Sequence, residues 1–123
     1  MPKKIISIDQ GTTNSRAVLF DDKCNLIDYK QKEFKQYFPS NGWVEHDPEE
    51  IWNSVFEVTK EIIGKHGVSH TDIGAIGITN QRETALLWDK KTGKAVYPAI
   101  VWQDRRTSGL CENLKGEGLE KEL

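Results

Sequence analysis

The chain has 123 residues, of which 37% are hydrophobic and 29% are charged, and its formal net charge is −2. This composition is typical of a folded domain and excludes an intrinsically disordered chain. The small negative charge gives no electrostatic basis for binding a nucleic acid or an anionic membrane. No apolar run approaches the roughly 20 residues of a membrane-spanning helix. The two cysteines, Cys24 and Cys111, form neither a CxxC pair nor a disulfide framework. We therefore expect a cytoplasmic protein with free thiols and with no nucleic-acid or membrane partner.

Three runs near the start of the chain have the pattern of strands joined by turns. The run 4–9 is rich in isoleucine, which is typical of a strand buried on both faces. It is followed by the polar, glycine-containing turn 10–14 and by a second apolar run, 16–20. The run 25–34 is more polar, which favours a position near the edge of a sheet. Together these runs predict a three-stranded meander.

The clearest helix signal begins at Asp47. This residue can cap the helix, Pro48 suits the first helical position, and Glu50 completes an Asp-x-x-Glu capping box. Apolar residues then recur at intervals of four, three and four to form one stripe, namely Ile51, Val55, Val58 and Ile62. Gly64 and Gly67 offer the stop.

The second half of the chain predicts a return to the sheet. The apolar run 73–79 follows the helix, and a strand–helix–strand succession implies that it joins the sheet in parallel. Residues 85–97, with a turn at 91–93, have the pattern of an added hairpin. The run 100–102 is short and apolar, and Asp104 is expected to open a last helix that continues through Leu114. The expected fold is therefore α/β, with a mixed sheet, a crossover helix and an added hairpin.

The turn after the first strand has the chemistry of a phosphate loop. Gly11 allows the backbone to approach a ligand closely, and the hydroxyls of Thr12 and Thr13 can donate to phosphate oxygens. Asp9 would repel a phosphate directly, so its natural role is to bind Mg²⁺ or its waters. Arg16 adds a fixed positive charge suited to phosphate oxygens.

Other phosphate-binding motifs do not fit this segment. A Walker loop requires GxxxxGK[ST], which occurs nowhere in the chain, and a dinucleotide fingerprint opens a helix, whereas a strand follows here. An ordinary hairpin turn, in which Asp9 and the threonines satisfy backbone groups, would have the same spacing. Spacing alone therefore leaves both interpretations open.

Four segments in chain order resemble the FGGY carbohydrate kinases. The segment 8–16 is similar to the first phosphate segment of that family, and 43–48 is similar to the start of its first long helix. The segments 77–84 and 102–106 resemble those members of the family that phosphorylate glycerol. The resemblance implies a ribonuclease H-like domain of the actin/Hsp70/hexokinase ATPase type, present in part. Residues 1–123 would be the first part of the amino-terminal domain, with its remainder and the carboxy-terminal domain outside the chain.

The resemblance also implies a role for individual residues. ATP phosphates would be bound by five residues of the first turn and second strand: Gly11, Thr12, Thr13, Asn14 and Arg16. Position 14 is commonly serine in the family, so the contact made by Asn14 is expected to differ in detail. Asp9 would serve the Mg²⁺ site, Arg82 and Glu83 would hold glycerol, and Trp102 would form an apolar wall beside it.

The chemistry of these last residues agrees with a polyol ligand. Arg82 supplies hydrogen-bond donors and Glu83 supplies an acceptor, which together can satisfy hydroxyl groups. Neighbouring residues on a strand face opposite ways, so both reach one ligand only if the backbone turns just past Thr79. The alternatives are a surface ion pair for Arg82 and Glu83, and core packing for Trp102.

The histidines carry no comparable signal. His66 and His70 are four residues apart, but two of the usual metal ligands would be missing and a helix end separates them. His46 is expected in a loop or beside the helix cap.

For the complete protein the resemblance implies conversion of ATP and glycerol to ADP and sn-glycerol 3-phosphate, in a homo-oligomer. The aspartate base of the family lies downstream, so we expect no catalytic residue in this chain and no turnover by the chain alone. Uncovered strand edges and apolar faces are expected to favour association. Three alternatives are a related kinase for another polyol or a ketose, an ATP-binding conformational switch of the actin/Hsp70 type, and a structural domain without a ligand.

Overall fold

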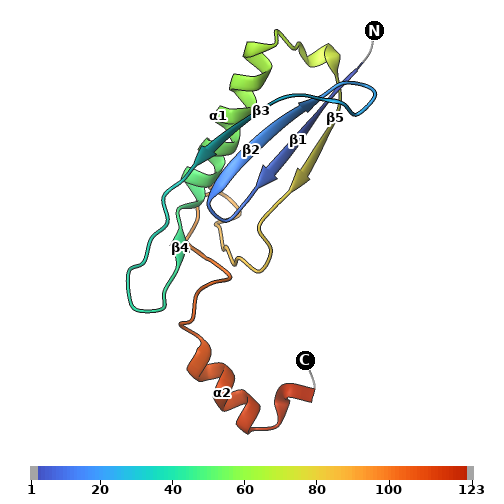
Figure 1. Cartoon of the computed structure of the whole chain (residues 1–123). Coiled ribbons are helices and arrows are strands. Elements are labelled where there is room, and N and C mark those ends of the chain that lie inside the picture. Colours follow the sequence, from blue (N-terminus) through green and yellow to red (C-terminus); the bar gives the residue numbers. More distant parts are fainter. Residues whose placement is uncertain (1–2, 122–123) are drawn as a thin grey trace.

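The computed structural model describes residues 3–121, and its central feature is a four-stranded sheet with one long helix along one face (Figure 1). The strands are β1 (Lys4–Gln10), β2 (Asn14–Phe20), β3 (Leu26–Glu33) and β5 (Ile73–Thr79), in the spatial order β3-β2-β1-β5. β2 is antiparallel to both β1 and β3, and β5 is parallel to β1. The predicted meander, the edge position of the third strand and the parallel return are confirmed.

The helix α1 (Pro48–Lys65) begins where Asp47 predicts it. The Asp47 carboxylate accepts a hydrogen bond of 2.9 Å from the backbone N–H of Glu49, which satisfies one of the free donors of the first turn. The expected capping box is wrong, because the Asp47 carboxylate accepts from the N–H of Glu49 and not from that of Glu50. Glu50 instead accepts a hydrogen bond of 2.6 Å from the Tyr37 hydroxyl, because the incoming loop brings Tyr37 within reach.

Gly67 ends the helix, as predicted, whereas Gly64 lies inside it. Gly67 adopts a φ of +57°, a left-handed conformation that suits glycine. Its N–H donates to the Gly64 carbonyl, and the N–H of Val68 donates to the Ile63 carbonyl at 3.0 Å. These two bonds form a Schellman motif, which satisfies the last carbonyls of α1.

The core lies between α1 and the sheet. It consists of Ile6 from β1, two residues of β2, two of the helix stripe and one residue just past the end of the helix: Ala17, Leu19, Val58, Ile62 and Val68. Burial of an aliphatic side chain stabilises a fold by about 1.5–3 kcal/mol, so this cluster is the main source of cohesion.

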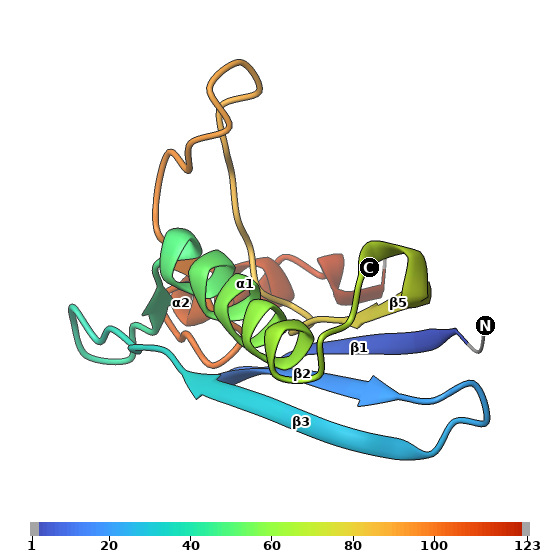
Figure 2. The ribbon, with the colours of Figure 1, turned by 90° about the horizontal axis from the view of Figure 1, so that it is seen from above.

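The sheet is not buried on both faces, which corrects the expectation for the first strand. Figure 2 shows α1 above β1, β2 and β3, with β5 beyond it. Ile76 and Ile78 of β5 pair with Ile6 and Ile8 and so share the helix-bearing face, yet they are 54% and 73% exposed. Within residues 3–121 α1 is too narrow to cover the fourth strand, and the predicted uncovered apolar face is confirmed.

A second, two-stranded sheet joins distant parts of the chain. β4 (Glu45–His46) pairs antiparallel with β6 (Ala99–Ile100). The expected hairpin is present between them in sequence, with a turn in which the Asp89 carboxylate accepts from the backbone N–H groups of Lys91 and Thr92. Its arms are joined only by the isolated bridge between Trp88 and Ala95, so they are not regular strands, and Figure 2 shows the hairpin projecting away from the main sheet.

The last helix, α2 (Ser108–Gly116), starts four residues after Asp104 and continues two residues past Leu114. The expected start at Asp104 is wrong because its carboxylate is engaged elsewhere, as described below. Two short 3₁₀ helices, η1 (His70–Asp72) and η2 (Leu119–Lys121), complete the described elements. Across residues 3–121, no helix has the length and apolar character needed to cross a membrane.

Candidate functional site

A polar cleft of ≈ 710 Å³ opens at the carboxyl ends of β1 and β5. Three segments line it: residues 9–12 at the end of β1, residues 79–83 after β5, and Trp102. Carboxyl ends of neighbouring parallel strands meet at one edge of a sheet, which is the usual place for a ligand in an α/β fold. A second groove of ≈ 770 Å³, mostly apolar, lies between residues 37–49 and 94–98 and contains none of the predicted site residues.

The turn between β1 and β2 is short because Gly11 permits a close backbone contact. The Gly11 N–H donates to the Asn14 carbonyl at 2.9 Å, so only residues 11–13 separate the two strands. A Cβ at position 11 would lie 3.1 Å from the Asn14 carbonyl oxygen. The second strand therefore begins at Asn14, two residues earlier than predicted.

The residues predicted to bind phosphate divide into two groups. Gly11 and Thr12 line the cleft, together with Asp9, the predicted Mg²⁺ ligand, whereas Thr13, Asn14 and Arg16 do not. Asn14 donates from its amide to the Thr13 hydroxyl at 3.3 Å.

Arg16 lies directly opposite Asp9 in the β1–β2 register, so both side chains project from the sheet face that α1 does not cover. The Arg16 guanidinium lies 5.8 Å from the centre of the Tyr29 ring, and its Nε is buried without a hydrogen-bond partner. Arg16 is thus a cation beside the first turn with an unsatisfied donor.

The backbone turns directly after Thr79, as the sequence requires. Arg82 and Glu83 both line the cleft, and Glu83 has a φ of +57°, which is uncommon for a residue other than glycine. Within the described part of the chain neither residue forms an ion pair. The alternative of a surface ion pair is therefore wrong.

Trp102 connects the two sides of the cleft. The residue is 53% exposed, so the alternative of core packing is wrong. The indole Nε1–H donates to the Thr12 hydroxyl at 3.1 Å, which joins residues 90 positions apart. This bond places the predicted phosphate turn against the predicted apolar wall.

A buried network fixes the turn that carries Trp102. Asp104 accepts a hydrogen bond of 2.7 Å from the Val44 N–H, and Arg106 contacts Asp104 at 2.8 Å and Glu45 at 2.9 Å. The Arg106 guanidinium lies 3.8 Å from the centre of the Trp43 ring, a cation–π contact. The hydrogen bond from Arg106 lowers the pKa of Asp104 to about 2.

Four residues that line the cleft were not predicted as site residues, namely Gln10, Thr79, Asn80 and Gln81. Gln81 lines the cleft and donates from Nε2 to Nδ1 of His46 at 3.2 Å. His46 directly precedes the N-cap Asp47, so the expected place beside the helix cap is confirmed and the alternative of a loop is wrong. It lies in β4 and is fully buried, with its ring edge-on to Phe34 at a centroid distance of 5.0 Å. The alternation of β4 is too short to reveal this burial from sequence.

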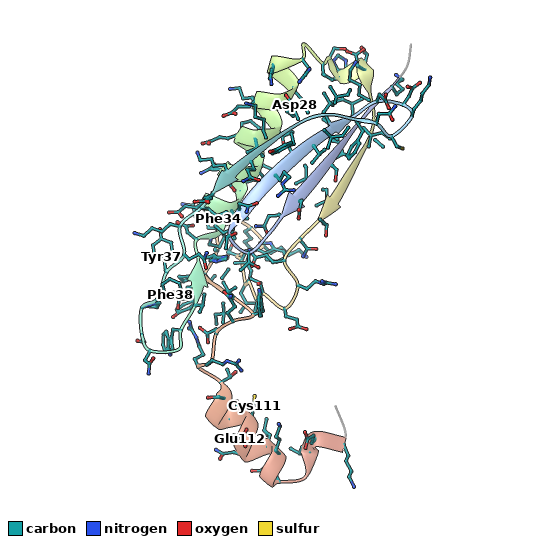
Figure 3. All side chains as sticks on the ribbon, viewed as in Figure 1. Asp28, Phe34, Tyr37, Phe38, Cys111 and Glu112 are labelled. Atoms are coloured by element: carbon teal, nitrogen blue, oxygen red, sulfur yellow. The ribbon has the colours of Figure 1, made fainter. Side chains whose placement is uncertain are left out.

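The described residues contain no group of three or more side chains that could hold a metal by themselves. His66 bonds to Asp28 at 2.9 Å, and Figure 3 shows Asp28 at the end of the sheet away from the turn that follows β5. Lys65 and then His66 lower the pKa of Asp28. The lone carboxylate of Asp9 beside Thr12 fits Mg²⁺, because that ion is usually held by one or two carboxylates together with phosphate oxygens and waters.

Comparison with known proteins places the chain in a family. The model for the amino-terminal domain of the FGGY family of carbohydrate kinases matches residues 4–123. The chain is 61% identical over 117 residues to a glycerol kinase of Sinorhizobium fredii, covering 95% of the chain and 24% of that relative. It is 58% identical over 116 residues to glycerol kinase 2 of Thermotoga maritima, covering 94% of the chain and 23% of that relative. The chain thus spans about a quarter of the length of these relatives.

Solved structures agree with the fold. The Plasmodium falciparum glycerol kinase with ADP has a TM-score of 0.87 at 37% identity, covering 94% of this chain and 23% of that one. A xylulose kinase of Lactobacillus acidophilus has a TM-score of 0.89 at 23% identity, covering 98% of this chain and 24% of that one. At this identity the similarity supports the fold alone. The predicted ribonuclease H-like fold class, present in part, is confirmed.

Proposed function

The chain belongs to the FGGY family of carbohydrate kinases, and on this premise we propose that it is the amino-terminal portion of an enzyme that phosphorylates glycerol with ATP. Residues 1–123 would form the first part of the amino-terminal domain, with the remainder of that domain and a carboxy-terminal domain following. The observation that carries the proposal is the hydrogen bond from Trp102 to Thr12, which sets the candidate polyol side of the cleft against its phosphate side. The identity of 61% to a glycerol kinase supports glycerol as the substrate.

On the phosphate side, the turn after β1 would receive the ATP phosphates. The hydroxyls of Thr12 and Thr13, the backbone at Gly11 and the amide of Asn14 can donate to phosphate oxygens. The guanidinium of Arg16 adds a positive charge beside this turn, across from Asp9 in the strand register. Asp9 would hold Mg²⁺, which when bound neutralises charge on the phosphate oxygens.

On the polyol side, Arg82 and Glu83 would bind the hydroxyl groups of glycerol. Their free guanidinium and carboxylate provide donors and an acceptor, and the exposed ring of Trp102 can cover the carbon chain. A site built to hydrogen-bond a hydroxyl discriminates against molecules that lack it, because the protein groups would then be left unpaired.

The reaction would be a direct in-line transfer of the γ-phosphoryl group to a glycerol hydroxyl, giving ADP and sn-glycerol 3-phosphate. This chain binds and orients the two substrates, whereas the residue that accepts the hydroxyl proton lies outside it. Phosphoryl transfer depends on placing nucleophile and phosphate together, so the chain alone should have no turnover. Release of ADP above background by the purified 123-residue chain would contradict this division of roles.

The experiment that tests the function uses the complete enzyme, obtained by reading the source gene beyond the codon for Leu123. Glycerol, other polyols and xylulose are compared as substrates in a coupled ADP assay. We expect glycerol to have the highest kcat/KM. Arg82→Lys keeps the charge but loses the planar fork of donors, and it should raise the KM for glycerol by roughly tenfold, the equivalent of one or two lost hydrogen bonds.

The matched control is Glu112→Gln, which changes an exposed residue on α2. This variant should leave the KM for glycerol and the KM for ATP unchanged. Preference for xylulose or another polyol would assign the enzyme to a different substrate within the family. ATP binding without phosphorylation of any of these substrates would favour an ATP-dependent conformational switch.

We also propose a cytoplasmic location and a homo-oligomeric state for the complete enzyme. The two cysteines are free and exposed, which suits a reducing compartment. The stacked pair Trp52 and Phe56 on the outer side of α1 is exposed, with ring centroids 6.4 Å apart. Light scattering of the complete enzyme tests the oligomeric state, and a monomer at micromolar concentration would refute it.

A further inference from the structure

The turn that carries Arg82 and Glu83 needs an external support. Glu83 has a φ of +57°, and a residue other than glycine holds such a conformation only where its surroundings impose it. Arg82 and Glu83 are exposed and form no ion pair with any described residue, so their own side chains do not supply that support.

Two hydrogen bonds of the Gln81 side chain brace this turn. The Thr84 hydroxyl donates to Oε1 of Gln81 at 3.0 Å, which closes the four-residue span around Arg82 and Glu83. The other end of the same amide, Nε2 of Gln81, donates to Nδ1 of His46 at 3.2 Å. Gln81 is thus held at both ends.

His46 is a rigid anchor for this brace. It is fully buried, its backbone pairs with Ala99 of β6, and its ring packs edge-on against Phe34. Phe34 follows the end of β3 in Figure 3, so the anchor connects the main sheet, the small sheet and the cleft.

The brace requires a neutral imidazole. Because the amide nitrogen of Gln81 faces Nδ1 of His46 and can only donate, Nδ1 is the acceptor, which assigns the single ring proton to Nε2, an atom buried without a hydrogen-bond partner among the described residues. Burial lowers the pKa of His46, against a smaller opposing effect of Glu50, so the neutral ring is favoured.

We propose that His46, Gln81 and Thr84 are positioning residues that hold the Arg82–Glu83 turn in the orientation in which both side chains face the cleft. The part of this inference that concerns the substrate rests on the proposed function. The part that concerns the turn depends only on the described contacts.

The test centres on Thr84, which is only partly buried and does not line the cleft, so its variants should fold. Thr84→Val removes the hydroxyl at nearly constant shape, and Thr84→Ser retains it. In the complete enzyme we expect Thr84→Val to raise the KM for the polyol about threefold to tenfold, the equivalent of one hydrogen bond. The KM for ATP should stay within twofold, and Thr84→Ser should behave as the wild type. Equal polyol KM values for the two variants would overturn the inference.

A second measurement on the 123-residue chain itself keeps this inference separate from the function. Nitrogen-15 NMR should show His46 as the neutral form protonated on Nε2, and the backbone order parameters of Arg82 and Glu83 should fall in Thr84→Val but not in Thr84→Ser. A proton on Nδ1, or unchanged order parameters in Thr84→Val, would overturn the positioning role even if the enzyme phosphorylates glycerol. If the enzyme uses another substrate but the order parameters fall as expected, the proposed function fails and the positioning role stands.

Discussion

Replacing Asp104 with asparagine should destabilise the chain, because the Asp104 carboxylate belongs to a buried ion-pair network. The side chains of Asp104, Glu45 and Arg106 are only 3%, 9% and 13% exposed. Asp104→Asn keeps the shape and an oxygen that can accept from the Val44 N–H, but it removes the negative charge that faces Arg106 at 2.8 Å.

The magnitude follows from what remains after the exchange. Breaking a buried ion pair costs about 3–5 kcal/mol when the partner is left uncompensated. Here Glu45 still contacts Arg106 at 2.9 Å, so we expect a smaller loss of about 2–3 kcal/mol in the free energy of unfolding. For a chain of this size that corresponds to a fall in Tm of roughly 8–12 °C.

The assay is urea unfolding of wild type and variant followed by circular dichroism from pH 7 to pH 3. Because Arg106 lowers the pKa of Asp104 to about 2, the carboxylate stabilises the fold above its unfolded value of about 4 and loses this effect as pH falls toward 2. The difference between wild type and Asp104→Asn should therefore be constant at pH 5–7 and shrink below pH 4. The control Asp22→Asn changes an exposed aspartate and should stay within about 0.5 kcal/mol. A loss for Asp104→Asn no larger than that of the control, or a difference independent of pH, would refute the reasoning.

Two further predictions concern the helix start and the buried histidine. Asp47→Ala removes the acceptor for the Glu49 N–H and should lower the free energy of unfolding by about 1 kcal/mol in urea, whereas an equal loss for Asp47→Asn would contradict capping as the cause. Burial lowers the pKa of His46, so the unfolded chain binds more protons than the folded chain below about pH 6.5. As the pH falls from 6.5 to 5, the free energy of unfolding of the wild type should therefore decrease more steeply than that of His46→Gln, by up to about 1.4 kcal/mol per pH unit. If the free energies of unfolding of the two proteins instead changed in parallel with pH, a buried neutral ring would be contradicted.

The parts of the fold that sequence predicted are those set by local patterns. The aspartate–proline start of α1 and the glycine at position 67 each act on neighbouring residues, and their effects appear in the structure as expected. The isoleucines of β1 likewise predicted a strand, although not which of its faces is covered. The turn after Thr79 was likewise predictable, because Arg82 and Glu83 could face one ligand only if the strand ended there.

The parts that sequence did not predict depend on partners far along the chain. Asp104 has the pattern of a helix cap, but the Val44 N–H, 60 residues away, engages its carboxylate and the helix starts later. The local sequence around His46 gives no sign of a strand, because its partner Ala99 lies in β6, far along the chain. A contact of this kind leaves no trace in local spacing, since either partner alone has an ordinary local interpretation.

The cleft is assembled by two independent routes that meet at one hydrogen bond. The parallel register of β1 and β5 places Asp9 beside Thr79, so the turns that follow these strands must emerge side by side. Trp102 is positioned by other contacts, namely the pairing of β4 with β6 and the hydrogen bond from the Val44 N–H to Asp104. Because its Nε1–H donates to Thr12, this hydrogen bond links the position of the small sheet to that of the turn between β1 and β2. The small sheet therefore sets the spacing between Trp102 and the turn after β1, which lie on two sides of the cleft.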